Sequence, residues 1–142
     1  MITSDRQLKA SKEKLMELKR SLEKNSESII NPILAKAAKV QTQALIQEIE
    51  TETFLYENLK TKGIAAIQLH SMADILNLPV MYRVAKGMSQ EQFARLVNVG
   101  LRQIARYESD GYENINGETL KKILSKIELS IKVEENLSPV KT

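Results

Sequence analysis

Residues 88–108 read MSQEQFARLVNVGLRQIARYE, and this stretch decides the fold of the chain. Ser89 is placed to cap a helix by accepting a backbone N–H three residues on, and Gln92 is placed to reciprocate, so the pair forms a capping box. Asn98 tolerates the left-handed backbone conformation in which many helices end. The stretch therefore predicts two short helices joined by a turn at 98–100, with Gly100 starting the second helix.

Apolar residues at helical spacing show which faces of the two helices are buried. The inward stripe of the first helix consists of Phe93, Ala94, Leu96 and Val97. Val99 fills the turn, and Ile104 and Tyr107 point inward from the second helix. The outward set of the second helix consists of Leu101, Arg102, Gln103 and Arg106. These residue types suit base edges, because arginine pairs with guanine, glutamine pairs with adenine, and an apolar side chain packs on the thymine methyl.

The same stretch resembles the helix-turn-helix of the Cro/cI-like (XRE) family and aligns with it without a gap. The matching positions are Gln90, Ala94, Val97, Val99, Ile104 and the ending Arg106-Tyr107-Glu108. The resemblance implies a five-helix, lambda-repressor-like domain. In such a domain the second helix of the helix-turn-helix enters the major groove of double-stranded DNA. It also implies that Gln90 contacts a phosphate.

Further roles follow from the resemblance. Base-reading side chains lie at the positions of Leu101, Arg102 and Arg106. Arg83, in the preceding helix, pairs with Glu108 and faces the DNA backbone. Two departures are visible: Asn98 replaces the usual turn glycine, and Gly100-Leu101 replaces a polar cap and a polar base reader. Most direct readout is therefore left to Arg102 and Arg106.

Other polar residues of this region are expected to position the protein on phosphates, since such contacts set register without reading sequence. The expected phosphate-contacting residues are Ser89, Gln90, Asn114 and Asn116. Gln103 completes the expected DNA-contacting set. We expect two copies to act together, as a repressor-like homodimer on half-sites about 34–36 Å apart.

The composition excludes several classes of protein. The chain has 142 residues, no cysteine, one histidine and a net charge of +3. Without cysteine, and with His70 alone, no metal site is expected. Glu48, Glu50 and Glu52 lie on a charged helical face rather than in a catalytic pair. No apolar run is long enough to span a bilayer, and no signal-peptide core is present. We expect a cytoplasmic protein that is not an enzyme and needs no cofactor.

The N-terminal part, 1–63, is predicted to be an antiparallel helical hairpin. The first helix covers 3–24, with an apolar stripe of Leu8, Leu15, Leu18 and Leu22. A polar break at 25–31 precedes a second helix from Pro32 to about Lys62, which Gly63 ends. Its interrupted stripe consists of Leu34, Ala38, Leu45, Ile49, Tyr56 and Leu59. The length of this helix favours a dimerisation or partner-binding arm over a hairpin packed only on its own chain.

A connector, 64–78, joins this arm to the DNA-binding domain, 79–135, and a tail covers 136–142. The segment 64–70 is either a short strand or helical, and Ser71 with Asp74 forms a second capping box. Within the domain, Pro79 starts a helix that Gly87 ends.

A loop at 109–117 precedes the last predicted helix of the domain. Its inward residues are Leu120, Ile123, Leu124 and Ile127. Its Lys121 and Lys122 are either solvated or near phosphate. Alternation at 129–135 predicts a strand, which pairs with 64–70 of the same chain or with its own copy. The expected fold is mainly α, with this small two-stranded pairing as its one β feature.

Two other functions remain open. The order of the parts, with the helix-turn-helix behind a helical arm, is similar to that of HigA-like antitoxins, which bind a toxin and repress their own operon. Alternatively, the chain is a protein-interaction module that has lost DNA readout, which Gly100-Leu101 at the tip of the recognition helix favours.

Overall fold

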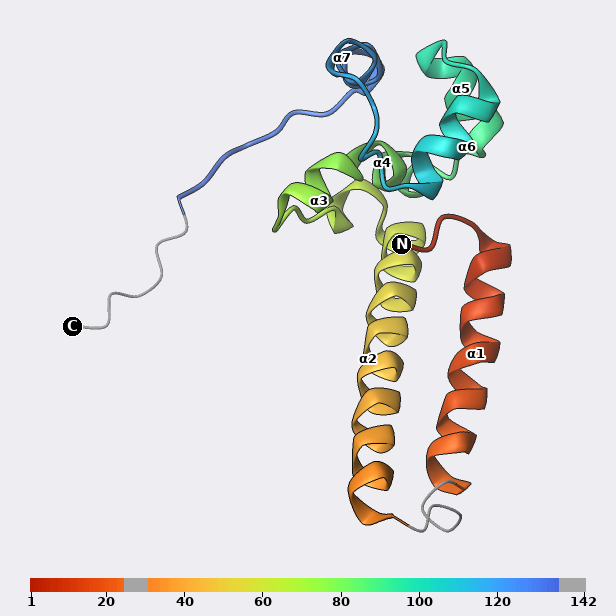
Figure 1. Cartoon of the computed structure of the whole chain (residues 1–142). Coiled ribbons are helices and arrows are strands. Elements are labelled where there is room, and N and C mark those ends of the chain that lie inside the picture. The colour runs from red at the N-terminus through yellow and green to blue at the C-terminus, as the bar shows by residue number, and fades with distance from the viewer. Residues whose placement is uncertain (25–30, 136–142) are drawn as a thin grey trace, which may run out of the picture.

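The chain folds into a long two-helix arm that carries a head of short helices at one end (Figure 1). The computed structural model describes residues 1–24 and 31–135. Helices α1 (Asp5–Lys24) and α2 (Pro32–Lys62) run antiparallel and form the arm. The predicted polar break, apart from Asn31, and the predicted tail lie outside the described residues.

The head follows α2 directly and consists of one 3₁₀ turn and five short α-helices. Its elements are η1 (Gly63–Ala66), α3 (Met72–Leu76), α4 (Leu78–Ala85), α5 (Gln90–Val97), α6 (Leu101–Ser109) and α7 (Gly117–Lys126). Gly63 ends α2 with a φ of 68°, a conformation that glycine adopts without strain. The predicted architecture, a helical hairpin followed by a five-helix domain, is confirmed.

The arm is held by a seam of half-buried side chains. Its α1 side consists of the predicted Leu8, Leu15, Leu18 and Leu22. On α2 the half-buried positions begin at Ala35 and continue through Ala38, Thr42, Ile46 and Ile49. Leu34 and Leu45 were predicted in this stripe and are wrong, since both are exposed. One residue step turns a helix by about 100°, so the stripe through Ala35 and Ala38 carries Leu34 and Leu45 out of the seam.

The arm and the head share one apolar core at the base of the arm. Phe93, Val97 and Ile104 have no exposed surface, and Tyr56 and Leu59 of α2 belong to the same cluster. Ile2, ahead of α1, also packs into this cluster. All four tyrosines of the chain, Tyr56, Tyr82, Tyr107 and Tyr112, are buried in it. The base of the arm is therefore fixed to the head by packing.

Two apolar residues predicted to be buried in the head are exposed. Leu96 of α5 and Leu124 of α7 both face solvent. In α5 the buried face is set by Phe93, Ala94 and Val97, and Leu96 lies about 100° around the axis from Val97. In α7 the buried residues are Ile123 and, just after it, Ile127, while Leu120 is half-buried. Both errors arise because short helices bury a narrower stripe than the sequence offers.

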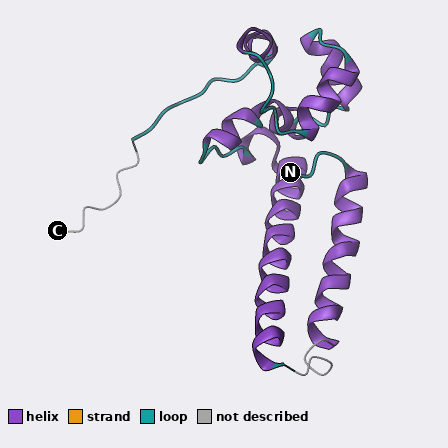
Figure 2. Cartoon of the chain, viewed as in Figure 1, coloured by secondary structure: helices purple, strands orange, loops and turns teal. Residues whose placement is uncertain are grey.

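The predicted β pairing of 64–70 with 129–135 within one chain is wrong: Figure 2 shows no strand among residues 1–24 and 31–135. After α2 the backbone closes a 3₁₀ turn, in which the Ile67 N–H donates to the Ile64 carbonyl at 3.0 Å. After α7 the Leu129 N–H donates to the Ile127 carbonyl, also at 3.0 Å. These local bonds use backbone groups that a ladder would need. The two segments nevertheless line one hollow of about 280 Å³.

Helix starts agree closely with the sequence. The Ser71 hydroxyl accepts from the Asp74 N–H at 3.2 Å, as predicted, while the Asp74 carboxylate accepts from the His70 N–H instead of closing the box on Ser71. Helix α4 begins at Leu78, with Pro79 in its first turn. None of the helices in the described ranges combines the length and the apolar character that crossing a bilayer requires.

Candidate nucleic-acid interface

The first of the two helices predicted around the turn at 98–100 is α5, and it starts at the predicted capping box. The Ser89 hydroxyl accepts from the Gln92 N–H at 3.1 Å, and the Gln92 side-chain oxygen accepts from the Ser89 N–H at 2.9 Å. Two otherwise unpaired donors are thereby satisfied. Phe93, Ala94 and Val97 then anchor α5 in the core, which fixes where the following turn begins.

The turn after α5 has the predicted conformation. Asn98 lies in the left-handed region, with φ 55° and ψ 48°. The Val99 N–H donates to the Ala94 carbonyl at 3.0 Å, and the Val99 side chain packs against the core. From α7, the Lys122 ammonium donates to the Asn98 carbonyl at 2.9 Å. The turn is therefore held from inside by Val99 and from outside by Lys122.

Helix α6 has one buried face and one exposed face, as predicted. Ile104, Tyr107 and Glu108 are buried. The exposed residues are Leu101, Arg102, Gln103, Arg106 and, at the end of the helix, Ser109. Arg106 lies over the Tyr107 ring, with its guanidinium carbon 5.8 Å from the ring centroid. The two arginines stand one helical turn apart on the same face, so α6 presents two guanidinium groups to solvent from a buried support.

The start of α6 departs from the usual pattern without requiring glycine. Gly100 has a φ of −60° and provides no side-chain cap. A Cβ at this position would meet only the Gln103 side-chain oxygen, at 4.0 Å. Glycine is therefore not needed for the backbone. Its effect is that the first N–H groups of α6 have no capping side chain.

Arg83 and Glu108 form the predicted ion pair, and both are buried. The guanidinium donates twice to the Glu108 carboxylate, at 2.7 Å in each bond. It also donates to the Met88 carbonyl at 3.0 Å and to the Thr3 carbonyl at 2.7 Å. The expectation that Arg83 also faces the DNA backbone is wrong, since only 4% of its surface is exposed. The N-terminal segment covers the guanidinium through the Thr3 carbonyl.

Gln90 is turned toward the same ion pair. Its amide nitrogen donates to the Glu108 carboxylate at 3.0 Å, and the residue is half-buried. An amide NH₂ carries two donors, so one of them is left for another acceptor. Gln90 therefore connects the start of α5 to the end of α6.

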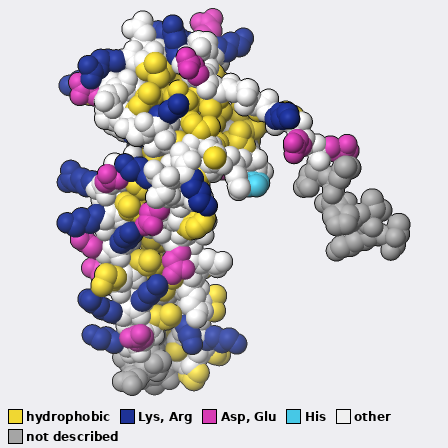
Figure 3. All heavy atoms as spheres, turned by 180° about the vertical axis from the view of Figure 1, so that it is seen from behind, with side chains coloured by type: hydrophobic (Ala, Val, Ile, Leu, Met, Phe, Trp, Pro, Cys, Tyr) yellow, Lys and Arg dark blue, Asp and Glu magenta, His cyan; other side chains and the backbone are white. Residues whose placement is uncertain are grey.

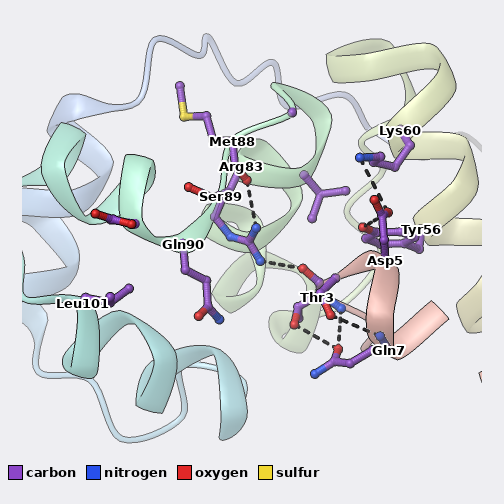
Figure 4. Close-up of a pocket in the computed structure, with 14 residues that line it drawn as sticks. Thr3, Asp5, Gln7, Tyr56, Lys60, Arg83, Met88, Ser89, Gln90 and Leu101 are labelled. Atoms are coloured by element: carbon purple, nitrogen blue, oxygen red, sulfur yellow. Dashed lines mark hydrogen bonds and ion pairs between the residues drawn. The ribbon is translucent and has the colours of Figure 1, made fainter. Parts of the chain in front are cut away.

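A hollow of about 620 Å³ lies where the arm meets the head (Figure 4). Ser89, Gln90 and Leu101 line it on the head side, and Thr3, Tyr56 and Lys60 line it on the arm side. The structure thus brings three of the predicted DNA-contacting residues together at one opening. Arg102, Gln103 and Arg106 stand on the exposed face of α6.

The two asparagines predicted to contact phosphate lie beyond α6 and bond locally. The Asn114 amide donates to the Asp110 carboxylate at 3.1 Å. The Asn116 side chain caps α7 by accepting from the Thr119 N–H at 2.8 Å. Each amide NH₂ keeps at least one hydrogen for a further acceptor.

The sequence analysis did not identify three residues that support this region of the structure. The Thr3 carbonyl accepts from Arg83, 80 residues away in the sequence, and no local sequence pattern predicts such a contact. Lys122 was noted only as solvated or near phosphate, and it holds the turn instead. Tyr112 follows α6 with a φ of 61°, and burial raises the pKa of its phenol. Its position after Gly111, in a polar loop, gave no signal of burial.

Comparison with known families bears on the head alone. Residues 81–133 match the family model described as Helix-turn-helix. These residues are a helix-turn-helix domain of the Cro/cI-like (XRE) kind. The helix-turn-helix domain contains the turn at Asn98, helix α6 and the Arg83–Glu108 pair, whereas the arm lies outside the match. No curated protein and no solved structure is matched by the chain.

The helix-turn-helix domain supports a DNA-binding, transcription-regulating kind of protein. This family is one of DNA-binding regulators and not of enzymes. Within the described ranges, no group of three or more His, Asp or Glu residues is placed to hold a metal ion.

Proposed function

We propose that the chain is a sequence-specific, repressor-like transcription regulator that binds double-stranded DNA as a homodimer in the cytoplasm. Helix α6 of each copy enters the major groove of one half-site. The observation that carries this proposal is the exposure of Arg102, Gln103 and Arg106 on a helix whose Ile104 and Tyr107 are buried. Such a helix offers base-reading groups without having to leave the core.

The support of α6 fits readout by rigid docking. The Asn98 turn fixes its start, and the Arg83–Glu108 pair fixes its end. The Tyr107 ring limits where the Arg106 guanidinium can go, because a cation is attracted to the ring face. Preorganised donors lose less conformational entropy on binding. Arg102 and Arg106 are the residues that we assign to base readout.

Phosphate contacts come from the residues around α6. Ser89, Gln90, Asn114 and Asn116 are assigned to this role, with one amide hydrogen of Gln90 remaining beside its bond to Glu108. The net charge of only +3 gives little general attraction to DNA. Two copies acting together therefore supply the affinity that one copy lacks.

The test uses a site selected by the protein itself from random duplex DNA. Arg102→Ala should weaken binding to this site by about 1–3 kcal/mol and relax the preference at one base pair. Binding to unrelated duplex should change little. Arg20→Ala, an exposed arginine of α1, is the matched control and should leave both affinities unchanged. Equal losses on selected and unrelated DNA would show that Arg102 only touches phosphate.

One observation favours a second candidate, a protein-interaction module. Leu101 at the tip of α6 is 46% exposed, and Gly100 before it offers no polar side chain. A salt titration separates the two functions. A regulator loses affinity steeply as salt rises and prefers one site strongly, because its phosphate contacts release counterions. An interaction module shows neither property.

The antitoxin function is supported by the order of the parts, with the arm ahead of the helix-turn-helix domain. In this case the arm binds a toxin protein, and the complex represses its own operon. Co-expression with the products of neighbouring genes tests it, since a cognate toxin should copurify with the full chain and not with a variant altered on the arm.

A further inference from the structure

Helix α2 has a second apolar stripe on the side away from α1. Its apolar members are Ile33, Ala37, Val40, Ala44 and Phe54, and Gln47 and Thr51 complete the spacing. Every one of these side chains is exposed. Ile33 is 79%, Val40 57% and Phe54 69% exposed. Figure 3 shows hydrophobic side chains on the surface of the arm, between lysines and glutamates.

The stripe repeats with alternating steps of four and three residues, which is the heptad spacing of a helix that packs along another helix. It lies opposite the seam with α1, where Ala38 and Ile49 are half-buried. Large side chains stand near its ends, at Ile33 and Phe54, and Ala44 stands at its centre. A small residue at the centre lets two backbones approach closely.

The stripe is complementary to itself when a second α2 runs in the opposite direction. With a two-fold axis at Ala44, Ile33 of one copy comes within one residue's rise, about 1.5 Å, of Phe54 of the other. In the same register, Ala37 meets Thr51, and Val40 comes within one residue's rise of Gln47. Each large side chain therefore lies on a large one, and Ala44 meets Ala44 on the axis.

The charges beside the stripe favour the antiparallel direction. Lys36, Gln43 and Glu50 occupy one heptad position along its flank. In the antiparallel pair this flank meets itself, so Lys36 of each copy faces Glu50 of the other, and Gln43 meets Gln43. On the other side of the stripe, the corresponding heptad position holds Gln41, Glu48 and Leu55. In a parallel pair the side with Lys36 would face this other side, and Lys36 would lie beside Gln41 instead of a carboxylate.

Glu50 also has a partner within its own chain. Its carboxylate lies 3.1 Å from the Lys19 ammonium, and both side chains are about half exposed. Such an exposed pair is worth little by itself, and a carboxylate has room for two donors. Lys19 therefore leaves Glu50 available to Lys36 of a second copy.

We propose that the outer stripe of α2 binds a second copy of this chain in antiparallel register, with the two-fold axis at Ala44. This inference deepens the proposed function by naming the surface of the homodimer, and only its consequence for DNA rests on that function. The result is a layer of four helices, with the two α2 helices at its centre and a head at each end.

The arrangement sets the distance between the heads. From Ala44 to the end of α2 at Lys62 the helix rises about 27 Å, so the two ends stand about 54 Å apart. This separation exceeds the one-turn spacing of 34–36 Å that the family resemblance implied. The next whole number of DNA turns is two, which places the half-site centres about 70 Å apart.

Molar mass in solution tests the dimer without DNA. The full chain at tens of micromolar should have the mass of two copies. Ala44→Glu places two carboxylates on the axis and should raise the dimer dissociation constant at least about 100-fold. Ala10→Glu makes the same change at an exposed alanine of α1 and should leave the constant unchanged. A monomeric wild type, or a dimer indifferent to Ala44→Glu, would overturn the proposal.

Charge reversal tests the direction. Lys36→Glu and Glu50→Lys should each weaken the dimer about tenfold, since each creates two like-charge pairs. The double variant should return to the wild-type constant, because both pairs are restored with their signs exchanged. Failure of the double variant to recover would overturn the antiparallel register. Circular dichroism shows that each variant keeps its helices.

Cysteine trapping gives an independent reading, because the chain has no cysteine of its own. Ile33→Cys mixed with Phe54→Cys should form a mixed disulfide under mild oxidation, and Ile33→Cys alone should stay unlinked. Self-linking of Ile33→Cys would show a parallel pair and overturn the proposal. A chain that forms the dimer but does not bind DNA would refute the proposed function and leave the dimer proposal standing. Failure of the dimer proposal can therefore be distinguished from failure of the proposed function.

Discussion

The two phenylalanines of the chain stand in opposite surroundings. Phe93, in the head, has no exposed surface, while Phe54, on the arm, is 69% exposed. The contrast extends to whole helices. Seven of the eight residues of α4 are buried, whereas none of the 20 residues of α1 is. The head thus contains fully buried apolar helix faces within one chain, and α1 contains none.

Full burial in α2 is confined to the end that meets the head. The buried residues of α2 are Thr53, Tyr56 and Leu59, all in its last third. Farther out, α1 and α2 are joined by exposed pairs such as Lys19–Glu50, which contribute little in water. Helices of this length gain most of their stability from packing. One core therefore holds the head and the base of the arm, while the distal part of the arm leaves apolar side chains such as Ile33 and Val40 exposed.

The largest expected effect tests this contrast directly. Phe93→Ala should lower the free energy of unfolding by about 3–5 kcal/mol, because it opens a cavity in the core. Phe54→Ala, at a concentration where the chain is monomeric, should change it by less than about 0.5 kcal/mol. Chemical denaturation measures both. Similar losses in the two variants would contradict the contrast.

The Arg83–Glu108 pair comes next in size. Glu108→Ala should cost about 3 kcal/mol, because it leaves the guanidinium buried without its carboxylate. Glu91→Ala is the matched control, since Glu91 lies 3.8 Å from Arg95 in an exposed pair of α5. This control should cost no more than about 0.5 kcal/mol. Thermal unfolding reports both values, and a small loss in Glu108→Ala would mean that the pair does not hold α6.

The turn between α5 and α6 predicts a smaller effect. Asn98→Ala should cost about 1 kcal/mol, because alanine adopts the left-handed conformation only with strain. Asn98→Gly should cost nothing or stabilise, because glycine adopts it freely. The two variants remove the same side chain, so their difference isolates the backbone. Equal stability of the two would show that φ 55° at Asn98 carries no strain.

The smallest expected effect is a pH dependence at the base of the arm. The Tyr56 hydroxyl donates to the Asp5 carboxylate at 2.7 Å, and this bond, with the charge of Lys60, holds the pKa of Asp5 below its ordinary 3.8. A lowered pKa stabilises the fold above pH 3.8, and the stabilisation is lost as pH falls through the folded value. The stability of wild type and Asp5→Asn should therefore converge in acid. In a Tyr56→Phe background their difference at neutral pH should shrink.

The sequence predicted local features better than contacts between distant segments, for a physical reason. Capping at Ser89, the αL residue Asn98 and the inward Ile104 are local signals, and each is confirmed. The face of α2 is set by its packing on α1, so Leu34 and Leu45 were misplaced. The contact of Thr3 with Arg83 spans 80 residues and leaves no periodic trace. Local interactions could be predicted from the sequence, and contacts between distant segments could not.

The burial of all four tyrosines has a spectroscopic consequence. The chain has no tryptophan, and its tyrosines lie in the head and at the base of the arm. Near-ultraviolet circular dichroism and intrinsic fluorescence therefore report on that end of the molecule, while the distal helices contribute only to the far-ultraviolet signal. Recording both signals in a single melt separates fraying of the arm from collapse of the core. A tryptophan placed at Phe54 would give the arm its own emission.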